Sequence, residues 1–192
     1  MVNIFLIRHG KASSGWNSLD PSLDSEGERQ SREVSKKLLN YSSKDFDIFS
    51  SPMMRCRQTS EPFCKKTKKE IIIDRKVSEI PSPINDLDKR VVWLRRVLPL
   101  NWEDLMNDKD SAASGIDYRI WRSDIIEFLE GLKNDAFIFT HFVVINSVVS
   151  FLKKRDEVVS FNPDNTSVTH LKYDGKLLKI ISLGAESVTK IN

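Results

Sequence analysis

The chain has 192 residues, of which 40% are hydrophobic and 30% are charged, a composition typical of a globular protein with one domain. Its 30 basic and 27 acidic residues leave a net charge of +3, and the sequence pI is about 8.8. This mildly basic, well-mixed charge suits a small anionic substrate. Without a dense basic arm, it argues against a nucleic-acid partner.

No apolar run approaches the length of about 18 residues that a membrane-spanning helix needs, and the apolar N-terminal stretch is too short for a signal peptide. We therefore expect a cytoplasmic protein with no membrane partner. Cys56 and Cys64 are eight residues apart, which on a helix separates their Cα atoms by about 12 Å, too far for a disulfide. Reduced thiols are expected. The Cys and His spacing fits no metal site, so we expect no metal or other cofactor.

The first predicted element is a strand buried on both faces, within the stretch Val2–Gly10. Ligands of open α/β sheets bind at the carboxyl ends of strands. At this edge Arg8 and His9 place a fixed positive charge beside a titratable nucleophile, and Gly10 lets the backbone turn without a Cβ clash. Taken alone, these three residues also fit an ordinary polar turn.

The next elements are a helix and a short strand. Ser25 and Glu28 have the spacing of a capping box, which predicts a helix that starts at Ser25 and ends near Asn40. The strand follows over Asp47–Ser50.

A second helix is predicted over Ser51–Phe63, with Pro52 in its first turn. Arg55 also falls in this turn, where backbone N–H groups favour an anion, although a lone arginine is more often a surface residue. Arg57 lies roughly 200° further round the helix, so the two arginines cannot share a target. We interpret the basic cluster Lys65–Lys69 as a solvated helix end rather than a nucleic-acid patch.

Glu70–Asp74 is predicted to be another buried strand, and Glu79 lies just past its end. Glu79 is either a surface loop residue or a carboxyl in a partly desolvated cleft, where its pKa would rise and it could act as an acid. Short helices over Ile84–Lys109 are expected to form a cap over the strand edge. Trp93 and Arg96 are three residues apart and could face a ligand together, or Trp93 belongs to the core.

A longer helix is predicted over Gly115–Lys133, and a buried strand over Ala136–Thr140 stops at His141. This second histidine at a second strand end parallels the first. A buried helix over Val143–Leu152 follows.

The last predicted element is a hairpin over residues 167–183, which turns at Asp174 and Gly175. His170 lies in the middle of its first strand, and we interpret it as a surface or structural histidine.

The candidate site residues share one property, because each falls at or just after a predicted strand end. They are Arg8, His9, Arg55, Glu79 and His141. Two arginines would repel a metal cation. The same set suits a phosphoryl group, whose negative charge needs fixed donors and planar guanidinium groups.

At this point the chain resembles the histidine phosphatase superfamily, which includes the phosphoglycerate mutases. The resemblance covers essentially the whole chain. It rests on R-H-G after the first strand, S-P-x-x-R-x-x-Q-T over Ser51–Thr59, Glu79 after a strand and the late His141. Two further motifs agree: D-x-x-L-x-x-x-G-x-x-Q, formed by Asp20, Leu23, Gly27 and Gln30, and N-x-S-x-T over Asn165–Thr169.

The resemblance implies a role for each candidate. His9 would attack phosphorus and become phosphohistidine, while Arg8, Arg55 and His141 would bind the phosphoryl oxygens. Glu79 would protonate the leaving oxygen and then help to activate water. No metal is implied. Neutral imidazole is a suitable nucleophile near pH 7 because its unperturbed pKa is about 6.5.

The expected fold is an α/β domain over residues 1–192. It has three layers, a mostly parallel central sheet with helices on both faces, and a C-terminal β-hairpin. Residues 84–109 would be a cap or insertion within it.

Two positions depart from the family pattern. Phe142 stands where the family commonly has glycine, which would narrow or reshape the pocket floor. Ile80–Pro83 replaces a glycine-rich segment after the acid. The segment between Glu79 and His141 is shorter than in phosphoglycerate mutases, which favours hydrolysis of a small phosphomonoester over a mutase reaction. A phosphoglycerate-type mutase, a non-catalytic phosphate-binding protein and a phosphoprotein substrate are the alternatives.

Substrate specificity would come from the loop 11–24 and the segment 84–109. The side chains in these segments that could contact the substrate, a small phosphorylated molecule, are Trp16, Asn17, Arg90, Trp93 and Arg96. The sequence does not name the substrate, and it leaves a homodimer open.

Overall fold

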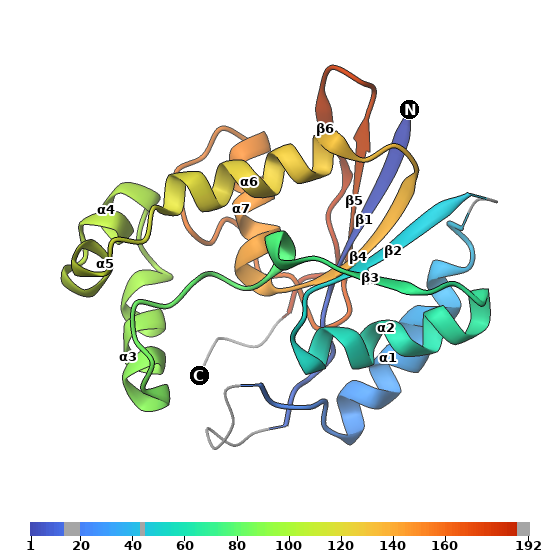
Figure 1. Cartoon of the computed structure of the whole chain (residues 1–192), viewed down its shortest axis with the longest axis horizontal. Helices are drawn as coiled ribbons and strands as arrows, with labels where there is room; N and C mark the ends of the chain where they lie inside the picture. The colour runs from blue at the N-terminus through green and yellow to red at the C-terminus, as the bar shows by residue number, and fades with distance from the viewer. Residues whose placement is uncertain (14–19, 43–44, 188–192) are drawn as a thin grey trace.

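The computed structural model describes residues 1–13, 20–42 and 45–187, and these form one six-stranded sheet with helices around it (Figure 1). The strand order is β3-β2-β4-β1-β5-β6. The strands are β1 (Val2–Arg8), β2 (Phe46–Ser50), β3 (Ile71–Ile73), β4 (Asp135–Thr140), β5 (Val168–Tyr173) and β6 (Leu178–Ser182). The first four strands run parallel, and β5 and β6 form the antiparallel hairpin. Trp16 and Asn17 lie outside the described residues.

Strand β1 lies inside the sheet and pairs with β4 in parallel and with β5 in antiparallel orientation. Its residues 4–7 are apolar and fully buried, as expected for a strand covered on both faces. Arg8 is in register with Thr140, and Ser50 is in register with Phe139. The chain therefore leaves β1, β2 and β4 at nearly the same level, so that His9, Ser51 and His141 emerge together.

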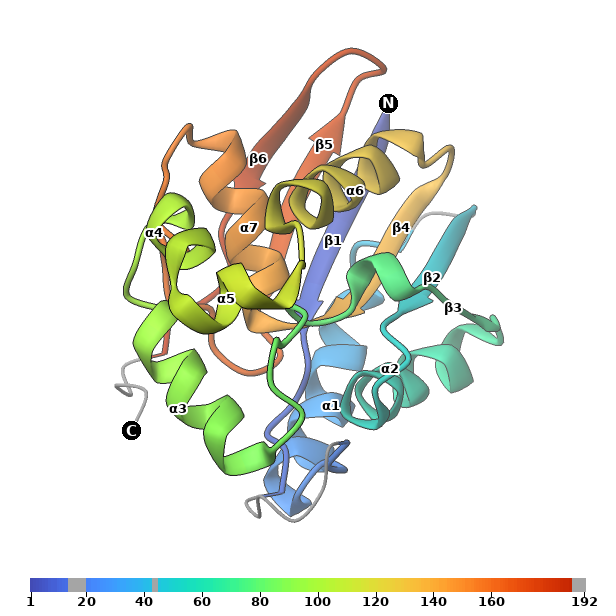
Figure 2. The same ribbon diagram turned by 60° about the vertical axis from the view of Figure 1, so that its left-hand side comes forward.

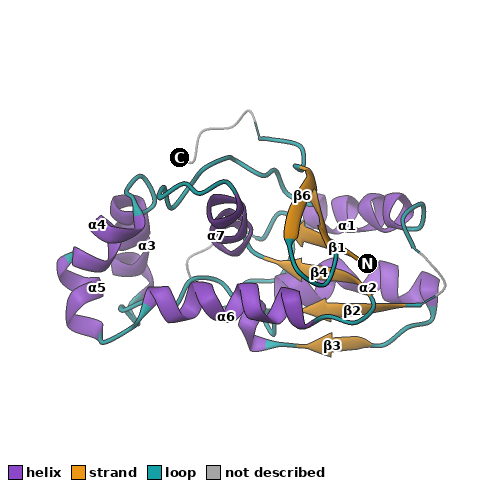
Figure 3. Ribbon diagram, turned by 90° about the horizontal axis from the view of Figure 1, so that it is seen from above, coloured by secondary structure: helices purple, strands orange, loops and turns teal. Residues whose placement is uncertain are grey.

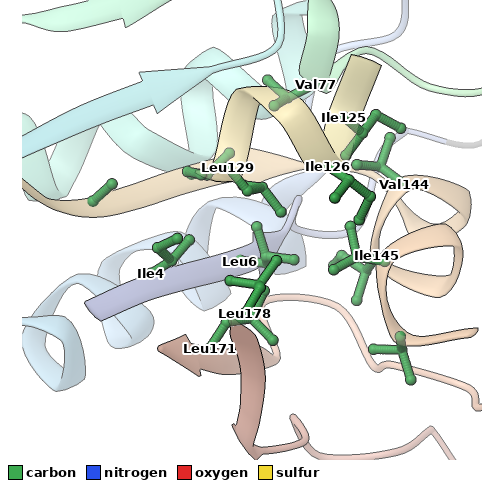
Figure 4. Close-up of a cluster of buried hydrophobic side chains, with 14 of the residues drawn as sticks. Ile4, Leu6, Val77, Ile125, Ile126, Leu129, Val144, Ile145, Leu171 and Leu178 are labelled. Carbon is green, nitrogen blue, oxygen red and sulfur yellow. The ribbon is translucent and has the colours of Figure 1, made fainter. Parts of the chain in front are cut away.

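Two pairs of helices cover the sheet, one pair on each face (Figure 3). α1 (Ser25–Leu38) and α2 (Met54–Thr67) pack on one face through a cluster that includes Phe5, Phe63 and Phe137. α6 (Tyr118–Gly131) and α7 (Phe142–Leu152) cover the other face through a larger aliphatic cluster (Figure 4). The predicted three-layer α/β fold is confirmed.

Three short helices lie between residues 84 and 114, at one side of the carboxyl ends of the strands (Figure 2). They are α3 (Leu87–Val97), α4 (Trp102–Asn107) and α5 (Lys109–Ser114). Their core contains Trp93, Trp102 and Leu105. We call residues 84–114 the helical segment; its role as a cap stays a prediction. No helix in the described ranges is long and apolar enough to cross a membrane.

The N-terminus of α1 differs from the predicted capping box. The helix does begin at Ser25, but Asp24 is the N-cap, and its carboxylate accepts a hydrogen bond of 2.7 Å from the Gly27 N–H. A carboxylate one residue earlier fills the capping position, so neither Ser25 nor Glu28 is needed there.

Other predicted boundaries also shift. β3 is shorter than Glu70–Asp74 and is not buried, because it is the edge strand: Ile72 and Ile73 are each 45% exposed. Pro52 precedes α2 rather than lying in its first turn. Gly115 ends α5 in a left-handed conformation, with a φ of 72°, so α6 starts only at Tyr118.

The loop after β1 lies very close to the first turn of α1, and two glycines allow this approach. A Cβ on Gly27 would lie 2.0 Å from the Lys11 carbonyl oxygen, and one on Gly10 would lie 2.8 Å from the Gly27 carbonyl oxygen. Both clashes involve backbone atoms, which cannot rotate away. The position of His9 therefore depends on the absence of side chains at these two sites.

We expect Gly27→Ala to lower the free energy of unfolding by about 1–3 kcal/mol, because the added methyl group forces the backbone at Lys11 to move. Gly131→Ala is the matched control, since a Cβ there meets nothing within 4 Å. Urea unfolding of both variants measures the difference. A Gly27→Ala protein as stable as Gly131→Ala would contradict the close approach.

Candidate active site

His9 follows β1 directly, and its ring is held in one tautomer. Nδ1 lies 2.8 Å from the carbonyl oxygen of Gly10, which can only accept, so Nδ1 carries the proton. The Nε2 lone pair is then free to attack an electrophile. The backbone of His9 is fixed as well: its N–H donates to the Thr140 carbonyl at 3.0 Å, and Asn165 donates to its carbonyl at 3.0 Å.

His141 follows β4 and is fully buried. Its Nδ1 lies 3.2 Å from a guanidinium nitrogen of Arg55, which can only donate, so Nδ1 accepts. Nε2 then carries the proton and donates to the Ser51 hydroxyl at 2.8 Å. The ring centres of His9 and His141 are 5.3 Å apart, in an edge-to-face arrangement. In this arrangement His141 orients Arg55.

Arg55 lies in the first turn of α2, as predicted, and its side chain is only 11% exposed. The carboxylate of Asp20 accepts hydrogen bonds from the Met54 N–H at 2.8 and 3.0 Å, which caps α2 from across the loop. The same carboxylate lies 3.8 Å from Nη1 of Arg55. Asp20 therefore fixes both the helix start and the arginine on it.

Arg8 is the second guanidinium of the site. Its Nη1 donates to the Pro163 carbonyl at 2.8 Å, and its guanidinium carbon lies 5.1 Å from the centre of the Phe142 ring. Arg8 and Arg55 each lower the pKa of His9, which places both charges near its ring. Two cations thus lie within electrostatic range of the His9 ring.

Glu79 is held by the first turn of α7. Its Oε1 accepts hydrogen bonds from the Ile80 N–H at 3.0 Å and from the Val143 N–H at 3.2 Å. Burial nevertheless raises the pKa of Glu79, because desolvation outweighs these N–H groups and the charges of Arg55 and Arg8. A carboxyl with a raised pKa is suited to donate a proton.

Both site histidines are neutral at pH 7. Burial, followed by the charges of Arg55 and Arg8, lowers the pKa of His9 to about 3. Burial also lowers the pKa of His141 well below its usual value, and Arg55 and His9 lower it further. A neutral imidazole is the nucleophilic form, so the environment favours the nucleophilic form of His9.

The structure thus brings together the five residues predicted from strand ends: His9, His141, Arg8, Arg55 and Glu79. Two other candidates have different partners. Trp93 is fully buried in the helical segment, and Arg96 forms ion pairs with Asp108 and Asp110. Trp93 is thus a core residue, the second of the two alternatives from the sequence, and the guanidinium of Arg96 is already paired with two carboxylates. His170 stacks on Phe5 at 4.4 Å between ring centres, a structural position in the sheet.

Sequence reasoning missed three supporting residues, although two of them lie inside the S-P-x-x-R-x-x-Q-T motif. Ser51 contacts His141, as described above. The Thr59 hydroxyl accepts from the Gly10 N–H at 2.9 Å and donates to the Arg55 carbonyl at 2.6 Å. Pro163, which holds Arg8 through its carbonyl, carried no signal because any residue has a carbonyl.

Cys56 lies against His141, with its sulfur 3.4 Å from Nε2. Burial raises the pKa of this thiol, so it stays protonated and unreactive. Cys56 and Cys64 are both free, as expected. Among the residues that the structure describes, no group of three or more His, Cys, Asp or Glu side chains could hold a metal ion.

A model of the histidine phosphatase superfamily (branch 1) matches residues 4–185 of the chain. Among solved structures, phosphoserine phosphatase from Entamoeba histolytica in complex with 3-phosphoglyceric acid is 18% identical, with 96% of this chain and 98% of that chain covered and a TM-score of 0.71. TTHB049 from Thermus thermophilus is 22% identical, with 96% and 99% covered and a TM-score of 0.62. Phosphoglycerate mutase from Bacillus anthracis is 16% identical, with 95% and 92% covered and a TM-score of 0.69. The search of curated proteins finds no match.

The lowered pKa of His9 predicts a dependence of stability on pH. The unfolded chain binds a proton at His9 below about pH 6.5, whereas the folded chain does not until about pH 3. Stability is therefore lost as the pH falls through this window, by at most about 1.4 kcal/mol per pH unit for this residue. Urea unfolding between pH 6 and pH 4 should show a shallower loss for His9→Asn than for wild type. Glu79 titrates in both proteins, so its contribution to the pH dependence of stability cancels in the comparison. If the free energy of unfolding falls equally steeply with pH in wild type and His9→Asn, the pKa of His9 is not lowered in the folded protein.

Proposed function

Because the chain belongs to the histidine phosphatase superfamily, we propose that it is a metal-independent phosphatase that hydrolyses a small phosphomonoester through a phosphohistidine on His9. The observation that carries the proposal is the free Nε2 of His9, whose other nitrogen is fixed on the Gly10 carbonyl at 2.8 Å. The solved relatives are a phosphoserine phosphatase and a phosphoglycerate mutase among others, which supports phosphatase or mutase chemistry in general.

In the first step, Nε2 of His9 attacks phosphorus. The new N–P bond forms as the bond from phosphorus to the ester oxygen breaks, and protonated Glu79 gives its proton to that oxygen. Arg8 and Arg55 stabilise the charge on the transferring group, and they are already fixed before the reaction begins. The products of this step are a free alcohol and phosphohistidine.

In the second step, a water molecule attacks phosphorus and the N–P bond breaks. Glu79, now a carboxylate, takes the proton from the water. Phosphate leaves and the neutral imidazole is restored, so no net proton is consumed by the protein. A covalent intermediate divides one difficult displacement into two easier ones.

His141 contributes in two arrangements. In the structure it accepts from Arg55 and so orients that guanidinium. For His141 to donate to a phosphoryl oxygen, its proton must lie on Nδ1. The Ser51 hydroxyl can then donate to Nε2 at the same 2.8 Å contact, because a hydroxyl both donates and accepts.

A first prediction of this proposal concerns His9. We expect His9→Ala to reduce phosphate release by at least about 10³-fold, since the nucleophile is gone. His170→Ala, which removes a histidine of the sheet, should retain most activity. The assay uses p-nitrophenyl phosphate and a panel of phosphorylated metabolites with a chelator present, and mass spectrometry after a rapid quench detects the phosphorylated protein.

Other outcomes distinguish the alternatives. Phosphate transferred to a second substrate rather than released would indicate a mutase. Phosphate binding without turnover would indicate a non-catalytic phosphate-binding protein. Equal activity of wild type and His9→Ala would refute His9 as the nucleophile.

Arg90 on α3 supports a narrower substrate class. Burial lowers the pKa of Arg90, while the charge of Glu79 raises it and that of Arg55 lowers it further. The charge of Arg90 in turn lowers the pKa of His141, so Arg90 lies within electrostatic reach of the site. No carboxylate of the described residues forms an ion pair with it. A third cation beyond Arg8 and Arg55 suits a substrate with a second anionic group, such as the carboxylate of a phosphorylated acid.

We expect Arg90→Ala to raise the KM for phosphoserine or 3-phosphoglycerate by about 10-fold, the loss of one charge-assisted contact, and to leave p-nitrophenyl phosphate nearly unchanged. Lys89→Ala, which removes an exposed charge from the same helix, should change neither value. Steady-state kinetics on the two substrate types provides the measurement. An equal change on both substrates would show that Arg90 does not select a second anion.

A further inference from the structure

Phe142 is the first residue of α7 and stands where the resemblance to the family suggests glycine. Its side chain is only 8% exposed, and the guanidinium carbon of Arg8 lies 5.1 Å from the centre of its ring. The negative face of an aromatic ring attracts a cation at this distance, and more strongly when both groups are desolvated. The ring therefore acts on one of the two site arginines.

Arg8 has few other contacts that fix its guanidinium. Nη1 donates to the Pro163 carbonyl at 2.8 Å, whereas Nε is buried and has no hydrogen-bond partner in the described part of the chain. One hydrogen bond leaves a guanidinium free to tilt about that contact. The ring of Phe142 supplies the surface that sets its plane.

The ring itself is held by the helical segment. Phe142 belongs to the same buried cluster as Trp93 and Trp102 of this segment and Tyr118 of α6, so it cannot turn without disturbing that core. It also lies between His141, which contacts Arg55, and Val143, whose N–H holds Glu79. Three consecutive residues at the start of α7 thus each contact a different group of the site.

We infer that Phe142 is a positioning residue that holds the Arg8 guanidinium for phosphoryl binding and links it to the packing of the helical segment. The inference rests on the proposed function in one respect, that Arg8 binds the phosphoryl group. Phe142 itself acts through Arg8.

The test measures binding of inorganic phosphate by calorimetry, together with the kinetics of p-nitrophenyl phosphate. Phe142→Leu and Phe142→Met remove the ring and keep apolar bulk, so that at least one should remain folded. We expect each to raise the Kd for phosphate by about 3- to 30-fold, the range that a cation–π contact supports. Phe142→Tyr retains the ring face and should restore binding.

Phe46→Leu is the matched control. Phe46 is 5% exposed and also carries a cation over its ring, with Lys69 at 4.4 Å, but it lies in the cluster beneath α1 and α2. Its replacement should leave the Kd for phosphate unchanged. A loss of phosphate binding in Phe46→Leu equal to that in Phe142→Leu would reveal a general effect of core disruption and overturn the inference.

A double-mutant cycle separates positioning of Arg8 from any other effect. On an Arg8→Met background, Phe142→Leu should cause no further loss of phosphate binding. The inference is wrong if the loss persists on that background, or if Phe142→Leu binds phosphate as tightly as an active wild type. A wild-type protein that neither binds nor releases phosphate would instead refute the proposed function, and this inference with it.

Discussion

The parallel pairing of β1 with β4 is the constraint on which the site depends. Arg8 stands opposite Thr140 in the register, so the residues that follow, His9 and His141, leave the sheet side by side. A shift of one residue would also reverse which side chains of β1 face each layer of helices, and both faces are apolar and filled. The packing of the two helical layers therefore fixes the distance between the two imidazoles.

Burial then sets the protonation of the site. Desolvation is the largest cause of the pKa shift at His9, His141 and Glu79, and it favours the neutral form of each. The arginines cannot give up their charge in the same way. The result is a site in which fixed positive charges lie near two neutral histidines and a carboxyl with a raised pKa, an arrangement that an entering phosphoryl dianion would compensate. Burial thus determines both the protonation of the site and its net positive charge, which favours an anion such as phosphate.

The sequence could predict what depends on local pattern. Apolar runs that stop at Arg8–His9 and at His141 predicted both strand ends, and the prediction of the fold was confirmed. Contacts between residues far apart in the chain could not be predicted from the sequence. The edge position of β3 depends on which strands pair. The burial of Trp93 was one of two alternatives from the sequence, and the structure decides it through a core shared by four helices, α3, α4, α6 and α7. The same limit explains why Ser51 was missed: its role exists only because His141, 90 residues later, packs against it.

The start of α7 shows how one short stretch can serve both the fold and the site. His141 is the N-cap of this helix, but its side chain makes no capping hydrogen bond. Glu79, from a distant part of the chain, accepts from the Val143 N–H and takes that place. A carboxylate at a helix N-terminus is stabilised by the helix dipole, while burial favours the protonated carboxyl. The two effects oppose each other at Glu79. Desolvation is the larger effect, so the pKa of Glu79 is raised in spite of the N–H groups that it accepts from. A raised pKa is what the proposed role of Glu79 as a proton donor requires.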